Sequence, residues 1–151
     1  MQTILFYRTG DAYGAFSNFS AHRIVLNEKT WRTVEHYFQA QKFAGTEHEE
    51  EIRREVSPMI VARMGRDRKR PLRPDWESVK DDVMREALRA KFSQHKDLRE
   101  MLLGTGDATL VEHSANDHYW ADGGDGSGLN RLGLLLMELR AALRKEETGM
   151  Q

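Results

Sequence analysis

The 151-residue chain contains no cysteine and no long apolar run, and each absence excludes a class of protein. Without cysteine, a disulfide framework, a thiolate zinc site and a cysteine nucleophile are all impossible. No stretch approaches the roughly 20 apolar residues that a membrane-spanning helix requires. Residues 1–9 also lack the basic and apolar regions of a secretory signal. The sequence therefore predicts a cytoplasmic protein that has no membrane partner.

An excess of charge of one sign is also missing, because 23 Lys and Arg residues face 24 Asp and Glu residues. A general polyanion binder owes its affinity to many unopposed cations. This class is therefore not expected, although the balance still permits a local basic patch. The length fits one hydrophobic core, so we expect residues 1–151 to form a single domain.

The common nucleotide and metal motifs are missing as well. The glycine-rich run at 123–128 is not followed by Lys-Ser or Lys-Thr, and it lacks the strand-loop-helix spacing of a dinucleotide site. His-Glu-x-x-His is absent, and His113 and His118 lie five residues apart in an expected loop. The sequence therefore predicts a protein that uses no metal ion and no other cofactor.

The remaining pattern is typical of an α+β chain that is predominantly α-helical, with a few short strands. Strands are expected at 4–7 and 109–112, and a hairpin at 22–31 with its turn at Asn27-Glu28. Helix starts at Thr33, Thr46 and Ser57-Pro58 predict helices to about residues 44, 56 and 65. Apolar periodicity predicts further helices at 78–94, 96–103 and 129–145. The last helix carries a leucine seam at positions 129, 132, 136, 139 and 143, which Leu134, Leu135 and Met137 widen.

The first candidate catalytic segment places Glu35 near the start of a helix, on the same face as Gln39 and Lys42. A carboxylate at this position is favoured by the helix dipole and needs no catalytic role. The functional interpretation is a general base that Gln39 or donors from a loop orient and that activates a water molecule. From these residues alone, the first interpretation is the stronger one.

A second segment holds five basic residues between positions 66 and 73, opposed only by Asp67. Such a run is usually a solvated surface loop. In a nearly neutral chain it is also the best candidate for a phosphate contact, because arginine pairs bidentately with phosphate oxygens. Trp76 follows the loop and either stacks on a heterocycle or packs the next helix onto the core.

The third segment is a long loop at 112–124, in which Asp117 and Asp122 flank the Tyr119-Trp120 pair. Long ordered loops often carry binding sites, whereas Asp residues also cap turns without any function. Two adjacent large aromatic residues favour a pocket.

Five segments, in order along nearly the whole chain, resemble the NADAR, or YbiA-like, family of N-glycosidases. They are residues 17–20 (SNFS), 33–42 (TVEHYFQAQK), 64–67 (MGRD), 76–80 (WESVK) and 116–123 (NDHYWADG). The resemblance implies a compact, mainly helical fold and the hydrolysis of N-glycosidic bonds. It also implies Glu35 as the catalytic carboxylate, with Asp117 or Asp122 as the second acidic group.

The same resemblance implies a set of substrate contacts. They are Asn18 for ribose or base edges, Arg66, Arg68 and Arg73 for phosphate, Trp76 and Trp120 around the base, and Phe19 and Gln39 as further substrate-binding residues. Lys69 and Arg70 make the basic loop denser than this role requires, which leaves a larger anionic substrate open.

The substrates that the resemblance implies are phosphorylated ribosylamino-pyrimidines, early intermediates of riboflavin biosynthesis, with release of ribose 5-phosphate. Two alternatives stay open. One is an ADP-ribosyl hydrolase that acts on ADP-ribosylated nucleobases. The other is a non-catalytic module that binds ADP-ribose or phosphoribosyl ligands. Such a module needs the aromatic and basic residues but no catalytic carboxylate.

Overall fold

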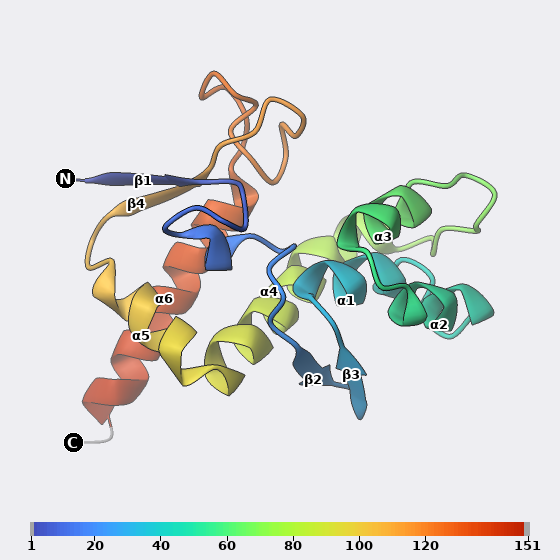
Figure 1. Ribbon diagram of the computed structural model, residues 1–151, viewed down its shortest axis with the longest axis horizontal. Coiled ribbons are helices and arrows are strands. Elements are labelled where there is room, and N and C mark those ends of the chain that lie inside the picture. Colours follow the sequence, from blue (N-terminus) through green and yellow to red (C-terminus); the bar gives the residue numbers. More distant parts are fainter. Residues whose placement is uncertain (1, 150–151) are drawn as a thin grey trace. The chain divides into compact units, whose positions relative to one another are not determined.

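The computed structural model describes residues 2–149, which contain six α-helices and four short strands (Figure 1). In chain order they are β1 (Thr3–Phe6), a 3-10 helix η1 (Gly14–Phe16), β2 (Ile24–Leu26), β3 (Lys29–Trp31), α1 (Val34–Gln41), α2 (Glu47–Arg54), α3 (Pro58–Gly65), α4 (Trp76–Gln94), α5 (Lys96–Gly104), β4 (Thr109–Glu112) and α6 (Arg131–Gly149). The predicted class, α+β and mainly helical, is confirmed. Among the described helices, none combines the length and the apolar character needed to cross a membrane.

Contacts divide the chain into two units. One contains the N-terminal segment up to Ser17 together with the chain from His95 onward, and the other is Asn18–Gln94. The expected single domain over residues 1–151 stays a prediction.

The first unit is built on a two-stranded parallel sheet. Strand β1 pairs with β4 in the register Thr3 with Thr109, and α6 packs against β4. Helix α6 lies close to β4 because Gly133 of α6 has no side chain: a Cβ there would meet the carbonyl oxygen of Leu110 in β4. Parallel pairing requires a long crossover connection, and here the two strands are more than 100 residues apart in sequence.

The second unit combines the β2–β3 hairpin with helices α1 to α4. Asn27 and Glu28 form the two-residue turn, as predicted, and both have positive φ, 55° and 64°. Such a conformation at both central positions matches the twist of the flanking strands. Side-chain caps at Thr33, Thr46 and Ser57 are also confirmed, since each hydroxyl accepts a backbone N–H from the first turn of its helix.

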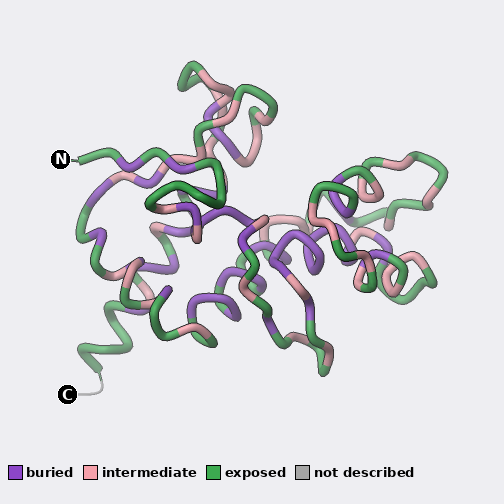
Figure 2. Tube along the Cα trace, in the orientation of Figure 1, coloured by how far each residue is buried: buried purple, intermediate pink, exposed green. Residues whose placement is uncertain are grey.

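Helix α1 lies at the centre of this unit, and all eight of its residues are buried (Figure 2). It packs against α2, α3 and α4. The helix ends at Gln41, three residues before the predicted end, because the backbone tightens: the N–H of Lys42 bonds the carbonyl of Gln39 at 3.2 Å. The turn closes at Gly45, whose φ of 82° suits glycine.

Two predicted helix starts were wrong. Helix α4 begins at Trp76, and Ser78 lies inside its first turn, where its hydroxyl donates to the carbonyl of Asp75. Helix α6 begins at Arg131, because Asn130 has a positive φ of 50°, which is outside the helical region. Leu129 is therefore outside the helix and 59% exposed. Leu134 is 44% exposed, so the leucine seam is narrower than predicted.

Candidate functional site

Glu35 lies in the first turn of α1, and its side chain is held from within the helix. The Gln39 side-chain amide donates to Glu35 Oε2 at 3.0 Å, which confirms the predicted pairing across one turn. The backbone N–H of Glu35 donates to the carbonyl of Asn18 at 3.1 Å. With only 8% of its surface exposed, the carboxylate sits on a rigid, buried element.

The turn that carries Glu35 is fixed by its neighbour His36, which is fully buried. His36 Nδ1 lies 2.7 Å from the hydroxyl of the capping residue Thr33, and Nε2 lies 2.6 Å from the carbonyl of Glu55. Because a carbonyl can only accept, Nε2 carries the proton and Nδ1 accepts from Thr33. Burial lowers the pKa of His36, which keeps this ring neutral.

Gln39 is in turn packed against the last residue of α3. A side chain at Gly65 would collide with the Gln39 amide, so the absence of a side chain there makes room for it. The Gln39 amide oxygen is buried and has no hydrogen-bond partner among residues 2–149. Its orientation is fixed nevertheless, because the amide nitrogen must face the carboxylate of Glu35.

Lys42 continues the same face of α1 and was missed as a site residue. Its Nζ donates to the carbonyl of Gly65 at 3.2 Å. Burial lowers the pKa of Lys42, an effect that nearby Glu35 opposes and nearby Arg66 reinforces. The spacing in the sequence pointed to Lys42 as a site residue, since it follows Glu35 by seven residues and shares its helix face.

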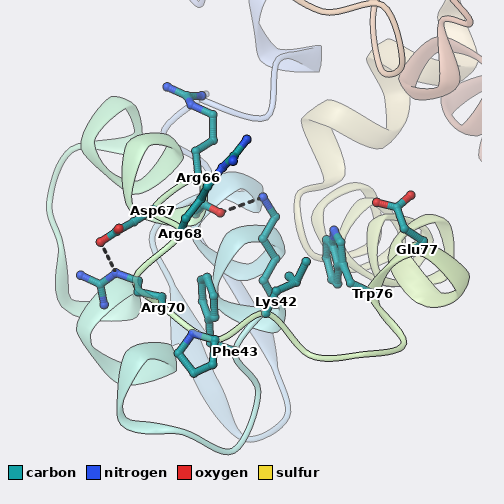
Figure 3. A pocket seen from close by; sticks show the side chains of 11 residues that line it. Lys42, Phe43, Arg66, Asp67, Arg68, Arg70, Trp76 and Glu77 are labelled. Atoms are coloured by element: carbon teal, nitrogen blue, oxygen red, sulfur yellow. Dashed lines mark hydrogen bonds and ion pairs between the residues drawn. The ribbon is translucent and has the colours of Figure 1, made fainter.

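A cavity of about 400 Å³ opens beside Lys42 and Gly65 (Figure 3). Its lining combines cationic, acidic and apolar side chains. The cationic ones are Lys42, Arg66, Arg68 and Arg70, the acidic ones Asp67 and Glu77, and the apolar ones Phe43, Pro71, Leu72 and Trp76. The predicted basic loop and the predicted tryptophan thus meet at one cavity, adjoining the helix that carries Glu35.

Trp76 forms part of the cavity wall although its ring is only 5% exposed. It packs edge-on against Phe38 with ring centroids 5.0 Å apart, and Lys42 Nζ lies 5.9 Å from its ring centre. The indole therefore packs α4 onto α1, as one of the two predictions has it, and it also lines the cavity. Its stacking on a heterocycle stays a prediction.

The arginines of the basic loop differ in their partners. Arg66 and Arg68 line the cavity, and neither forms an ion pair within the described part of the chain. Arg73 is not part of the lining. Its guanidinium binds the carboxylate of Asp75 at 2.6 and 3.0 Å and donates to the carbonyl of Gln41.

Asn18 and Phe19 precede the hairpin of the same unit. Asn18 is 8% exposed, and its amide nitrogen makes a weak 3.7 Å contact with the sulfur of Met84. Its amide oxygen is buried and has no hydrogen-bond partner within residues 2–149. Phe19 is partly exposed.

The predicted loop residues Asp117, Trp120 and Asp122 belong to the other unit. Asp117 Oδ1 accepts the backbone N–H groups of Tyr119 and Trp120, at 2.9 and 2.8 Å, and thereby forms a tight turn. The Trp120 ring is partly exposed and meets the Tyr119 ring edge-on, with centroids 4.8 Å apart.

Asp122 uses both carboxylate oxygens. Oδ1 accepts from the N–H groups of Ser114 and Gly124, and Oδ2 lies 2.8 Å from Nδ1 of His113. Burial by itself would raise the pKa of Asp122. The hydrogen bonds from His113, Gly124 and Ser114 outweigh burial and hold this pKa below its ordinary value. The carboxylate is therefore ionised and organises the glycine-rich loop.

Comparison with known proteins defines the class. The NADAR domain family matches residues 5–144, so the chain belongs to this family. N-glycosidase YbiA of Escherichia coli (strain K12) is 63% identical over 144 residues, which cover 95% of this chain and 90% of the relative. The NMR structure of E. coli YbiA superposes with a TM-score of 0.91 at 62% identity, covering 97% of this chain and 88% of that one.

A plant relative has a more specific name. The chloroplastic riboflavin biosynthesis protein PYRR of Zea mays is 46% identical over 155 residues, covering 93% of this chain but 25% of the plant protein. Together, the family match and the similarity to named N-glycosidases establish the reaction class: the chain is a hydrolase that acts on N-glycosyl compounds.

Proposed function

We propose that this enzyme hydrolyses the C–N glycosidic bond of phosphorylated ribosylamino-pyrimidines, intermediates of riboflavin biosynthesis, and releases ribose 5-phosphate. One observation carries the proposal: helix α1 holds the buried carboxylate of Glu35 and leads into Lys42, which lines the cavity together with the unpaired Arg66 and Arg68. Glu35 itself is not among the cavity-lining residues. The name of the Zea mays relative supports the riboflavin context.

Glu35 is the proposed catalytic carboxylate. Cleavage of a C–N glycosidic bond passes through an oxocarbenium-like state, which a nearby carboxylate stabilises. Glu35 also accepts a proton from the attacking water, whose oxygen bonds to the anomeric carbon. The C–N electron pair stays on the departing nitrogen, which takes up the proton that Glu35 has received. Gln39 holds Oε2 and so orients the carboxylate for this step. Asp117 and Asp122 stay predictions for a second acidic group.

Arg66 and Arg68 are the proposed phosphate ligands. Both line the cavity and neither is neutralised by a carboxylate in residues 2–149, so a phosphate dianion would meet two available guanidinium groups. Lys42 adds a third cation, and an anion bound beside it would raise its depressed pKa. Trp76 supplies an aromatic edge, while Asn18, Phe19, Trp120 and Arg73 stay predicted substrate contacts.

The test is direct. The purified protein is incubated with a ribosylamino-pyrimidine 5′-phosphate, and ribose 5-phosphate is followed with a reducing-sugar assay. Release of ribose 5-phosphate, with no release by the Glu35→Gln variant, supports the proposal. Binding of the phosphate compound without any release by the unaltered enzyme would identify a binding module instead.

A second substrate class, ADP-ribosylated nucleobases, is favoured by one observation, the number of cations that line the cavity. Arg66, Arg68 and Lys42 all line the cavity, and the two phosphates of a pyrophosphate could contact all three. Asp67 and Glu77 in the same lining reduce the net positive charge. The same assay with an ADP-ribosylated nucleobase as substrate separates the two: faster turnover of this compound would make the enzyme an ADP-ribosyl hydrolase.

A further inference from the structure

Arg70 is the one cavity-lining arginine whose charge is already compensated. Its Nη1 donates to Glu51 Oε2 at 2.9 Å and to His48 Nδ1 at 2.8 Å, and both partners belong to α2. Its Nε lies 3.6 Å from Asp67 Oδ2. Figure 3 shows the guanidinium turned toward Asp67 and away from Lys42 and Trp76. Only 16% of the side chain is exposed.

The loop that contains Arg70 is tied to Lys42 at both of its ends. Lys42 Nζ donates to the carbonyl of Gly65, and the Lys42 carbonyl accepts the N–H of Arg73 at 3.0 Å. Between these anchors, Arg70 is the side chain that connects the loop to α2. Without that connection, the five basic residues of the 66–73 loop, opposed within it only by Asp67, would repel one another and spread.

We propose that Arg70 is a positioning residue, which ties the 66–73 loop to α2 and thereby holds Arg66 and Arg68 at the cavity wall. It acts through these two arginines and does not itself bind the phosphate. This inference rests on the proposed function, because it assigns the phosphate contact to Arg66 and Arg68. Preorganising a charged loop increases ligand affinity, since less ordering is needed when the ligand binds.

The experiment measures binding of ribose 5-phosphate by isothermal titration calorimetry, with ribose as the neutral comparison. Arg70→Gln removes the tie, and Arg70→Lys keeps the charge but loses the planar guanidinium, which faces α2 through Nη1 and Asp67 through Nε. A double variant, His48→Phe with Glu51→Leu, removes both α2 acceptors and leaves Arg70 in place. The phenyl ring preserves the packing of His48 on Phe43. Lys69→Gln is the matched control, because it removes one charge from the same loop at a position outside the cavity lining.

If Arg70 positions the loop, Arg70→Gln and the double variant each weaken ribose 5-phosphate binding by about tenfold. The variant that combines all three substitutions loses no more affinity than Arg70→Gln alone. Arg70→Lys shows a similar loss of affinity, whereas Lys69→Gln shows little loss. The kcat at saturating substrate stays unchanged in all of these variants, which separates positioning of the loop from damage to the site of Glu35. Thermal unfolding of each variant shows that the protein is folded in every titration.

Three results would overturn the inference. Weak binding in Arg70→Gln but not in the double variant would show that Arg70 contacts the phosphate itself. Unchanged affinity in both, with or without a lower melting temperature, would make the tie merely structural. An equal loss in Lys69→Gln would indicate a general charge effect. Arg68→Ala tests the proposed function separately: if it leaves ribose 5-phosphate binding unchanged, the phosphate site is misplaced, whatever Arg70 does.

Discussion

The side-chain amide of Gln39 occupies the space that a side chain at Gly65 would need. Because the same amide donates to Glu35 at 3.0 Å, the last residue of α3 controls the orientation of the catalytic carboxylate proposed on α1. A glycine at the end of one helix is thus coupled to the chemistry of another.

Gly65→Ala should therefore impair catalysis more than folding. The new methyl group displaces the flexible end of Gln39, and the carboxylate of Glu35 loses its orienting donor. Misplacement of a catalytic group reduces the rate by up to about a hundredfold, so we expect kcat to fall about ten- to hundredfold. Gly104→Ala is the matched control, since Gly104 also ends a helix but has open space around it. Equal kcat values in the two variants would contradict the coupling.

Glu35→Gln preserves the shape of the side chain but removes its basicity and charge. Loss of a general base costs about 10²–10⁴ in rate, so kcat should collapse while substrate affinity and melting temperature stay near their original values. Glu47→Gln serves as a control, because Glu47 also lies in the first turn of a helix but is exposed. If Glu35→Gln retains turnover within a few-fold, the catalytic role passes to Asp117 or Asp122.

Arg68→Ala and Arg73→Ala should behave differently, although the sequence assigned both residues to phosphate. Loss of a charge-assisted contact costs about 1.5–3 kcal/mol, or roughly ten- to hundredfold in affinity. We expect this loss for Arg68→Ala with the phosphorylated substrate and much less with its dephosphorylated form. Arg73 is already paired with Asp75, so Arg73→Ala should have the smaller effect. Titration of both ligands into both variants checks this, and equal weakening of the two ligands by Arg68→Ala would remove it from the phosphate site.

Activity should not depend on a metal ion. The chain has no cysteine, and among residues 2–149 no three His, Asp or Glu side chains are grouped as metal ligands. We expect full turnover after exhaustive EDTA treatment followed by gel filtration. Loss of turnover that one divalent ion specifically restores would refute this prediction.

Lys91 on α4 should make stability depend on pH. It is 1% exposed, and burial lowers its pKa to about 7 from 10.5. Between these two values the unfolded chain binds a proton that the folded protein lacks, so the free energy of unfolding rises with pH. The expected slope from this group is about 1.4 kcal/mol per pH unit.

Lys91→Met removes that contribution. Relative to the original chain, the Met variant should be most stable at and below pH 7, and its advantage should shrink as the pH rises toward 10.5. Urea unfolding of both proteins across this range measures the difference. Lys96→Met, at an exposed position, is the control. Parallel stability curves for Lys91→Met and the original chain would show that Lys91 titrates alike in the folded and unfolded states.

The sequence by itself determined the local features of this protein. The caps at Thr33, Thr46 and Ser57 and the turn at Asn27-Glu28 follow from contacts between residues a few positions apart. The pairing of Glu35 with Gln39 follows from the pitch of one helix. Such features need no information about distant segments, and so periodicity and residue type predict them.

Only the tertiary structure decided features whose partners come from elsewhere in the chain. Whether an arginine of the basic loop is available depends on Asp75, and on His48 and Glu51 of α2, and nothing in the loop itself distinguishes Arg68 from Arg70. The start of α6 was mispredicted because Asn130 has a positive φ of 50° and its side chain bonds the backbone of Leu110 and Glu112 in β4. Gly65 matters because Gln39 packs against it, across 26 positions of sequence. Competition among distant hydrogen-bond partners, ion pairs and side-chain volumes is settled only when the chain is folded.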